Sequence, residues 1–321
     1  MKKLASFEGI DPELALVLEG QDVLTDVLSP DTIEAARAAS VRRASQRSLP
    51  GTGEPRRFSI DGPQAAIDLW FFAANSKAAA PCMLWFHGGG YVMGQGRDMW
   101  FGQFFSEKVG CHVLSVEYRL APEHRAPAAI EDGLAALDWL RSNYETLGVD
   151  PARIAIGGAS AGGGVAASVA LLNRDRGGDP LALQLLLYPM LDRNHDTPSG
   201  RRKGQPIWWR EQSEACWSMY LGDDVEPDVL RYAAAAEASV LNGLPKSRIF
   251  VGTVDLFHDD NRSFHDRLVA AGGESVFHSY PGMFHGGEVI GSETQVGRRM
   301  LADYIATVRT DLVCASGFNE E

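Results

Sequence analysis

Cysteine is scarce in this chain, with four residues among 321. They lie far apart in the sequence, which excludes both the close spacing of a zinc site and the density of a disulfide scaffold. Long apolar runs are lacking as well: no stretch of about 18 apolar residues occurs, so no membrane-spanning helix is expected. We expect free thiols, most of them buried, at Cys82, Cys111, Cys216 and Cys314.

Positive charge is also in short supply. The 30 Lys and Arg residues are outnumbered by 42 Asp and Glu residues, which gives a formal net charge of −12 at pH 7. A charge of this sign repels phosphate backbones and anionic membrane surfaces, so we expect no nucleic-acid partner. Acidic residues interrupt the N-terminal segment before an apolar signal region can form. We therefore expect a cytoplasmic protein, and a homo-oligomer is compatible with the sequence.

Short apolar runs alternate with amphipathic stretches along most of the chain. Several runs are apolar throughout, as strands of a parallel sheet covered on both faces are. The predicted strands are 65–72, 82–87, 112–119, 153–158, 183–189, 248–255 and 275–282. The predicted helices between them are 127–148, 161–177 and 261–273. This alternation predicts an α/β fold with a doubly wound sheet.

Two regions break the alternation. Residues 1–45 have a helical pattern, and residues 192–232 are polar and then rich in aromatics. We expect these two regions to form a helical cap over a catalytic domain made of residues 46–191 and 233–321. The segment 46–57 is the expected linker.

Ser160 stands alone in a glycine-rich segment. Residues 158–162 have the sequence Gly-Ala-Ser-Ala-Gly, between a predicted strand and a predicted helix, which is the G-x-S-x-G pattern of a nucleophile elbow. A turn this sharp forces unusual backbone angles and brings elements so close that only Gly and Ala fit. The alternatives are an ordinary capping serine and a phosphate-binding loop, but the latter lacks its Gly-Lys-Ser/Thr ending.

A second glycine cluster, His-Gly-Gly-Gly at 87–90, follows another predicted strand. Such a loop supplies backbone N–H groups to an oxyanion hole. Side chains at Gly88 and Gly89 would keep substrate away from those amides. The alternative is a flexible turn. We expect His87 to hold the loop in place and not to act as a base.

An acid and a base follow the serine in the order that this motif requires. Asp255 and His285 each end a predicted strand, where open α/β sheets deliver side chains to a site. Asp259 and Asp260 are the alternatives for the acid. The other histidines are expected in packing or at the surface: His112, His124, His195, His258, His265 and His278.

With these motifs together, the chain resembles the hormone-sensitive-lipase-like branch of the α/β-hydrolases, which are also called the bacterial family IV esterases. The resemblance runs in unbroken order from about residue 60 to 310. It rests on HGGG at 87–90, YRLAPEH at 118–124, PAAIED at 127–132, the serine elbow at 158–163, D-x-x-x-D-D at 255–260 and YPGMFHG at 280–286. It implies an α/β-hydrolase fold with a mostly parallel eight-stranded sheet and a helical cap.

The resemblance also implies an activity and its residues. The family hydrolyses mostly short-chain carboxylic esters and uses no cofactor, so a small-molecule ester is the expected substrate and no metal is expected. Many members carry Asp or Thr where this chain has Ala159, so a polar contact from that side chain is missing here. The resemblance implies a catalytic triad of Ser160, Asp255 and His285. It implies an oxyanion hole formed by the amides of Gly88, Gly89 and Ala161.

The residue types predict an acyl-enzyme mechanism. A serine is a poor nucleophile at its own pKa, so a histidine must take its proton while the aspartate fixes the imidazole tautomer. The same triad attacks all acyl carbons, so lactonase or amidase activity is an alternative to esterase activity. A non-catalytic ligand-binding protein on this fold is disfavoured, because serine, acid and histidine are all present.

Aromatic and charged side chains outside these motifs carry further expectations. Trp208 and Trp209 are expected to line the substrate entrance, with a place in the cap core as the alternative, while Trp217 is expected in the core of the cap. A pocket roofed by Trp208 and Trp209 predicts acyl chains of roughly two to eight carbons. We also expect Glu117, Arg119, Glu123 and Arg125 to take part in a buried or half-buried ion network that holds their loop under the HGGG turn.

Overall fold

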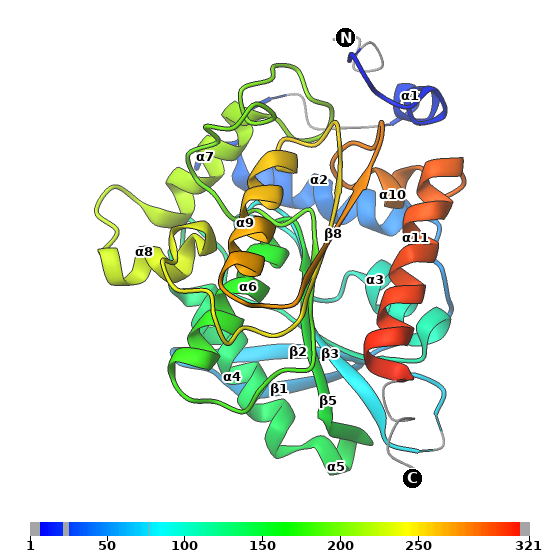
Figure 1. Ribbon diagram of the computed structural model, residues 1–321, viewed down its shortest axis with the longest axis vertical. Coiled ribbons are helices and arrows are strands. Elements are labelled where there is room, and N and C mark those ends of the chain that lie inside the picture. The colour runs from blue at the N-terminus through cyan, green and yellow to red at the C-terminus, as the bar shows by residue number, and fades with distance from the viewer. Residues whose placement is uncertain (1–6, 22–25, 77, 315–321) are drawn as a thin grey trace.

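The protein folds around one eight-stranded sheet with helices on both faces (Figure 1). The computed structural model describes residues 7–21, 26–76 and 78–314. The strands lie in the order β1-β2-β4-β3-β5-β6-β7-β8. The pairs β1/β2 and β2/β4 are antiparallel and the other neighbours are parallel. The bounds are β1 Arg56–Asp61, β2 Ala66–Phe72, β3 Ala80–Phe86, β4 His112–Val116, β5 Val149–Ala159, β6 Gln184–Leu187, β7 Ser247–Gly252 and β8 Ser275–Tyr280. The predicted fold class is confirmed.

Side chains on the central strands alternate between two hydrophobic cores. On β3, Leu84 and Phe86 join the core that α4 and α6 cover, whereas Met83 and Trp85 join the core under α11. Figure 1 shows α11 on one side of the sheet and α6 and α9 on the other. The helices are α1 Pro12–Glu19, α2 Ile33–Gln46, α3 Met99–Gln103, α4 Ala128–Ser142, α5 Tyr144–Leu147, α6 Ala161–Asp175, α7 Arg210–Leu221, α8 Pro227–Ala233, α9 His258–Ala270, α10 Gly287–Ile290 and α11 Gln295–Val308. Short helical turns are η2 Phe104–Val109, η3 Ala235–Glu237 and η4 Arg309–Val313.

All seven predicted strands occur, but their number and ends differ from the prediction. The strand β1 was not predicted, because only Ile60 is buried on this edge strand and its apolar alternation is weak. Its first two residues lie in the segment 46–57, which was expected to be a linker. The strand β4 stops at Val116. The helix α11 was not predicted, although its buried side chains, such as Met300 and Tyr304, follow the spacing of one helical face.

The two regions outside the strand-helix alternation meet in part. The buried amide of Leu28 donates a hydrogen bond of 3.0 Å to Oε1 of Gln212 on α7. The short helix α1 lies elsewhere, next to α10, where the amide of Asp11 donates to the carbonyl of Gly282 at 3.0 Å. Two residues before α2 thus contact different parts of the molecule: Leu28 contacts α7, and Asp11 contacts the loop after β8.

The four cysteines are free, and three of them, Cys82, Cys111 and Cys216, are buried while Cys314 is exposed. Burial raises the pKa of the Cys111 and Cys216 thiols to about 12. Across the ranges that the structure describes, every helix is too short or too polar to cross a bilayer. The expectation of free and mostly buried thiols is confirmed.

The charged side chains of the loop after β4 pair with other elements. In the described part of the chain Arg119 and Glu123 form ion pairs, but no ion pair joins Glu117, Arg119, Glu123 and Arg125 to one another, so a network among these four residues is wrong. Arg119 instead binds the fully buried Asp132 of α4, with Nη2 at 2.8 Å from Oδ1. Glu123 binds Arg37 of α2 at 2.7 Å. A buried carboxylate such as that of Asp132 needs a charged partner, and the sequence does not reveal which arginine supplies it.

This pairing generates a stability prediction. Arg119→Met removes the guanidinium from Asp132 and leaves an uncompensated buried carboxylate, which should lower the free energy of unfolding by about 3 kcal/mol. The matched control is Arg201→Met, because the Arg201 and Asp196 side chains form an exposed ion pair, 67% and 71% accessible, that contributes at most about 0.5 kcal/mol. Urea unfolding measures both. If both variants lost the same free energy of unfolding, the buried Arg119–Asp132 pair would contribute no more to stability than an exposed ion pair.

Candidate active site

Ser160 occupies a strained turn between β5 and α6. Its backbone angles are φ +57° and ψ −124°, a region that a non-glycine residue adopts only when its surroundings hold it there. Three backbone hydrogen bonds do so. The Ser160 amide donates to the carbonyl of Leu187 at 2.9 Å, and the Ser160 carbonyl accepts from the amides of Met190 at 2.9 Å and Gly164 at 3.1 Å.

The glycines around Ser160 leave no room for side chains. A Cβ on Gly158 would lie 2.3 Å from the carbonyl oxygen of Gly162. A Cβ on Gly162 would lie 2.1 Å from the carbonyl oxygen of Phe86 and 2.4 Å from that of His87, at the start of the HGGG loop. The two glycine clusters are therefore packed backbone against backbone. The predicted steric reason for the glycines is confirmed.

Ser160, His285 and Asp255 form one hydrogen-bonded chain. Oγ of Ser160 is 2.9 Å from Nε2 of His285, and Nδ1 of His285 is 2.8 Å from Oδ2 of Asp255. The other carboxylate oxygen of Asp255 accepts the amide of Phe257 at 2.9 Å, which fixes the plane of the carboxylate. With Nδ1 donating to the carboxylate, Nε2 is the nitrogen that can accept the serine proton. The structure thus brings together three residues that the sequence singled out.

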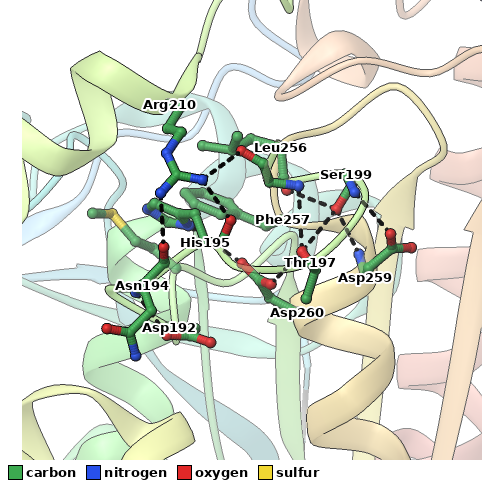
Figure 2. Close-up of polar contacts among 12 residues, drawn as sticks. Asp192, Asn194, His195, Thr197, Ser199, Arg210, Leu256, Phe257, Asp259 and Asp260 are labelled. Carbon is green, nitrogen blue, oxygen red and sulfur yellow. Dashed lines mark hydrogen bonds and ion pairs between the residues drawn. The ribbon is translucent and has the colours of Figure 1, made fainter. Parts of the chain in front are cut away.

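The two alternative acids have other partners. Asp259 accepts the amide of Ser199 at 2.8 Å, and Asp260 accepts the hydroxyl of Thr197 at 2.7 Å. Asp260 also lies 3.3 Å from Nδ1 of His195, which is fully buried. Figure 2 shows both carboxylates directed at the segment between β6 and α7 and joined to it. They anchor that segment to the start of α9, which rules them out as the partner of the imidazole beside Ser160.

The remaining histidines make contacts of their own. Nδ1 of His112 accepts the amide of Ala74 at 2.9 Å, and burial lowers the pKa of His112. His265 lies 2.8 Å from the hydroxyl of Ser275. Burial also lowers the pKa of His278. These contacts agree with the predicted packing roles.

The HGGG loop lies directly on the serine turn. A Cβ on Gly88 would meet Cβ of Ser160 at 3.4 Å, and Gly89 has φ +125°, where a side chain would also meet the carbonyl of Met93 at 2.1 Å. Within the ranges that the structure describes, the amides of Gly88, Gly89 and Ala161 donate no hydrogen bond. These N–H groups beside Ser160 are therefore free to bind an oxygen.

His87 holds this loop, as the sequence predicted. Its imidazole is stacked on the ring of Tyr118 with centroids 4.2 Å apart, and the Tyr118 hydroxyl donates to the His87 carbonyl at 2.7 Å. Nδ1 of His87 lies 2.8 Å from the carbonyl of Gly88. Burial lowers the pKa of His87, so the ring is neutral and serves as a packing element.

The tryptophans of the segment predicted to form a cap differ in position. Trp208 is buried, with its ring centroid 6.0 Å from that of His285, and a Cβ on Gly90 would lie 2.7 Å from its ring. Trp209 is half-buried at the residue before α7. Trp217 is buried and packs against Tyr91 with centroids 5.1 Å apart, in the predicted cap core. Of the two entrance candidates, Trp208 is the one that contacts the site.

A buried tyrosine and glutamate beside the imidazole were missed by the sequence reasoning. The ring of Tyr188 meets His285 edge-on with centroids 4.8 Å apart, and its hydroxyl donates to Oε1 of Glu288 at 2.7 Å. Glu288 is fully buried, and burial raises its pKa to about 7. The available signals were that Tyr188 directly follows β6 and that Glu288 comes one helical turn after His285. Neither signal distinguishes them from ordinary packing or surface residues.

In the part of the chain that the structure describes, no group of three or more His, Cys, Asp or Glu side chains is placed to hold a metal ion. The chemistry that the described arrangement supports is nucleophilic attack by Ser160. His285 is placed to act as the base, and free backbone amides lie beside the Ser160 turn.

Comparison with known proteins places this site in a family. Residues 83–288 match the family model described as the alpha/beta hydrolase fold. The chain is 35% identical over 283 residues to the esterase LipI of Mycobacterium tuberculosis, covering 86% of this chain and 87% of that protein. It is 35% identical over 292 residues to the carboxylesterase NlhH of the same organism, covering 86% and 88%. A bacterial heroin esterase has a similar solved structure, with a TM-score of 0.87, 33% identity and coverage of 96% and 99%.

The buried glutamate generates a prediction about stability and pH. The pKa of Glu288 is about 7 in the folded protein and ordinarily 4.5, so the folded state binds the proton more tightly. The stability contributed by the neutral carboxyl is fully present below about pH 4.5 and is lost as pH rises through about 7. Glu288→Gln removes this dependence. Between about pH 5 and pH 8, the variant should gain on the order of 2 to 3 kcal/mol relative to wild type in urea unfolding. A pH-independent difference would contradict this.

Proposed function

The chain belongs to the α/β-hydrolase family and is a carboxylic ester hydrolase, and from this premise we propose that Ser160, His285 and Asp255 carry out the hydrolysis. The observation that carries the proposal is the unbroken chain of contacts from Oγ of Ser160 through both nitrogens of His285 to Asp255, at 2.9 and 2.8 Å. All three side chains are at least nine-tenths buried, which strengthens the interactions among them.

The proposed reaction has two halves. In the first, Oγ of Ser160 attacks the acyl carbon while Nε2 of His285 takes its proton, and Asp255 stabilises the imidazolium that forms. The tetrahedral intermediate collapses to the acyl-enzyme, and the alcohol leaves with the proton from His285. In the second half, water gives a proton to His285 and attacks the acyl carbon. The acid is then released and Ser160 regains its proton.

We propose that the amides of Gly88, Gly89 and Ala161 bind the oxyanion of each tetrahedral intermediate. The free N–H groups and the contact of Gly88 with Ser160 support this role. Ala161 is the first residue of the 15-residue helix α6, whose N-terminus favours negative charge. A single donor of this kind contributes about 10²- to 10³-fold in rate.

We propose that residues 1–45 and 192–232 form the cap and that the catalytic domain comprises 46–191 and 233–321. The hydrogen bond between Leu28 and Gln212 supports the contact between the two cap segments. Trp208 lies between the HGGG loop and His285, so its indole is placed to limit the length of the bound ester. We propose a preference for acyl chains of roughly two to eight carbons, and the buried indole of Trp208 beside His285 supports it.

We further propose a cytoplasmic location without nucleic-acid partners. The four free thiols favour a reducing compartment, and a net charge of −12 repels polyanions.

The assignment of the triad is tested with p-nitrophenyl acetate. Ser160→Ala should lower turnover by about 10⁴-fold or more while the fold is kept, and a phosphonate ester should label Ser160 alone. Asp255→Asn leaves the imidazole in the wrong tautomer and should cost about 10⁴-fold, whereas Asp259→Asn should cost at most about tenfold, since Asp259 only anchors a loop. Labelling of another serine, or the reverse ranking of the two aspartates, would overturn the assignment.

The role of Trp208 is tested with a series of p-nitrophenyl esters of increasing acyl length. Each additional buried methylene stabilises binding by about 0.8 kcal/mol until the pocket is full. Trp208→Ala should therefore move the optimum to longer chains and keep acetate ester turnover. The control is Trp209→Ala, which should keep the wild-type profile because Trp209 is half-buried at the start of α7. An unchanged profile in Trp208→Ala would assign Trp208 to the cap core.

A further inference from the structure

A fully buried carboxylate lies next to the imidazole of His285. Glu288 belongs to α10, one turn after His285, and its side chain is closed off from solvent. Its Oε1 atom accepts two hydroxyls, from Tyr188 at 2.7 Å and from Tyr304 at 3.4 Å. Its Oε2 atom is buried and has no hydrogen-bond partner among the described residues. The charge on this group is therefore poorly screened and acts over a short range on its neighbours.

Tyr188 connects this carboxylate to the imidazole. Its ring meets His285 edge-on, with an interplanar angle of 67° and centroids 4.8 Å apart. Its backbone, at φ +37° after the end of β6, is held by an amide hydrogen bond to the carbonyl of Phe250. The Tyr188 ring is thus fixed at its backbone by β7 and at its hydroxyl by Glu288, so the imidazole of His285 packs against a ring that the glutamate holds in place.

We propose that Glu288 is a positioning residue for His285. The ionised carboxylate of Glu288 stabilises the imidazolium formed during catalysis, and its hydrogen bond to Tyr188 fixes the Tyr188 ring beside the imidazole. The proposal rests on the proposed roles of Ser160 and His285. A glutamine at position 288 would accept the same two hydroxyls. The distinct contribution of the glutamate is therefore its negative charge.

The groups around Glu288 define when it carries that charge. Tyr188 faces it from the end of β6, Tyr304 from α11 and His285 from its own loop, while Asp255 acts on Tyr188 from beyond the imidazole. Burial raises the pKa of Glu288 to about 7, and the Tyr188 hydroxyl and the charge of His285 oppose this shift. The carboxyl of Glu288 therefore ionises near neutral pH, so its charge beside the imidazole changes within the pH range of an activity assay.

The test is the pH profile of kcat and KM for p-nitrophenyl acetate between about pH 5.5 and pH 9, a range that spans both ionisations. In wild type, kcat should rise through two ionisations. In Glu288→Gln, kcat should rise with pH through a single ionisation, at a lower pH than in wild type. The plateau value of kcat should fall about three- to tenfold, with KM unchanged. Tyr188→Phe removes a donor to the ionised form, so the upper ionisation should move to higher pH.

The matched control is Asp303→Asn. Asp303 accepts the hydroxyl of Tyr280 at 2.7 Å, the same kind and length of contact as the Glu288 pair, but it belongs to the outer part of α11. This variant should keep the wild-type profile. If Glu288→Gln gives a profile parallel to wild type, or the same change as Asp303→Asn, the carboxylate is only structural and the inference is wrong.

Failure of the proposed function has a different signature. If Ser160→Ala keeps its activity, the triad assignment itself fails, whatever the profile of Glu288→Gln. If Ser160→Ala is inactive and Glu288→Gln is parallel to wild type, only the present inference fails. Should Glu288→Gln not fold, Tyr188→Phe decides: an upper ionisation that stays in place overturns the role of Glu288.

Discussion

The site depends on one close contact between two backbones. The turn after β5 and the loop after β3 approach so closely that a single methyl on Gly162 would overlap the carbonyl oxygen of Phe86, 2.1 Å away. This contact sets the position of the Ser160 hydroxyl relative to the free amides of Gly88 and Gly89. Because β3 and β5 are parallel neighbours in the sheet, the register of the strands positions both loops at once. The unusual angles of Ser160 are sustained by this packing and not by any local preference of serine.

Much of this arrangement could be predicted because steric constraints leave a mark on the sequence. Gly158 and Gly162 are required wherever backbones touch, so the two glycine clusters are visible without any structure. Strands buried on both faces are visible as apolar runs, and their carboxyl ends locate Asp255 and His285. The confirmed fold class and the observed triad geometry both follow from features of this kind.

The rest could not be predicted because it consists of side-chain pairs distant in sequence. Tyr188 and Glu288 are 100 residues apart, and nothing near either residue marks it as buried beside an imidazole. Arg119 was correctly expected to form an ion pair, but its partner Asp132 lies on the inner face of a helix where an acidic residue is unexpected. Choosing Trp208 over Trp209 likewise required the position of the HGGG loop, which only the tertiary structure shows.

The distribution of the site along the chain has a consequence for folding. The hydrogen-bonded side chains of Ser160 and His285 are 125 residues apart, and the parallel strands between them can pair only through crossover connections. Contacts of such large sequence separation form slowly, because the entropy of closing long loops opposes them. During synthesis, the serine turn leaves the ribosome long before the strand and loop that carry the histidine. Recovery of catalysis on refolding therefore reports the formation of this long-range contact, and partly folded chains that lack it are inactive even where their secondary structure is complete.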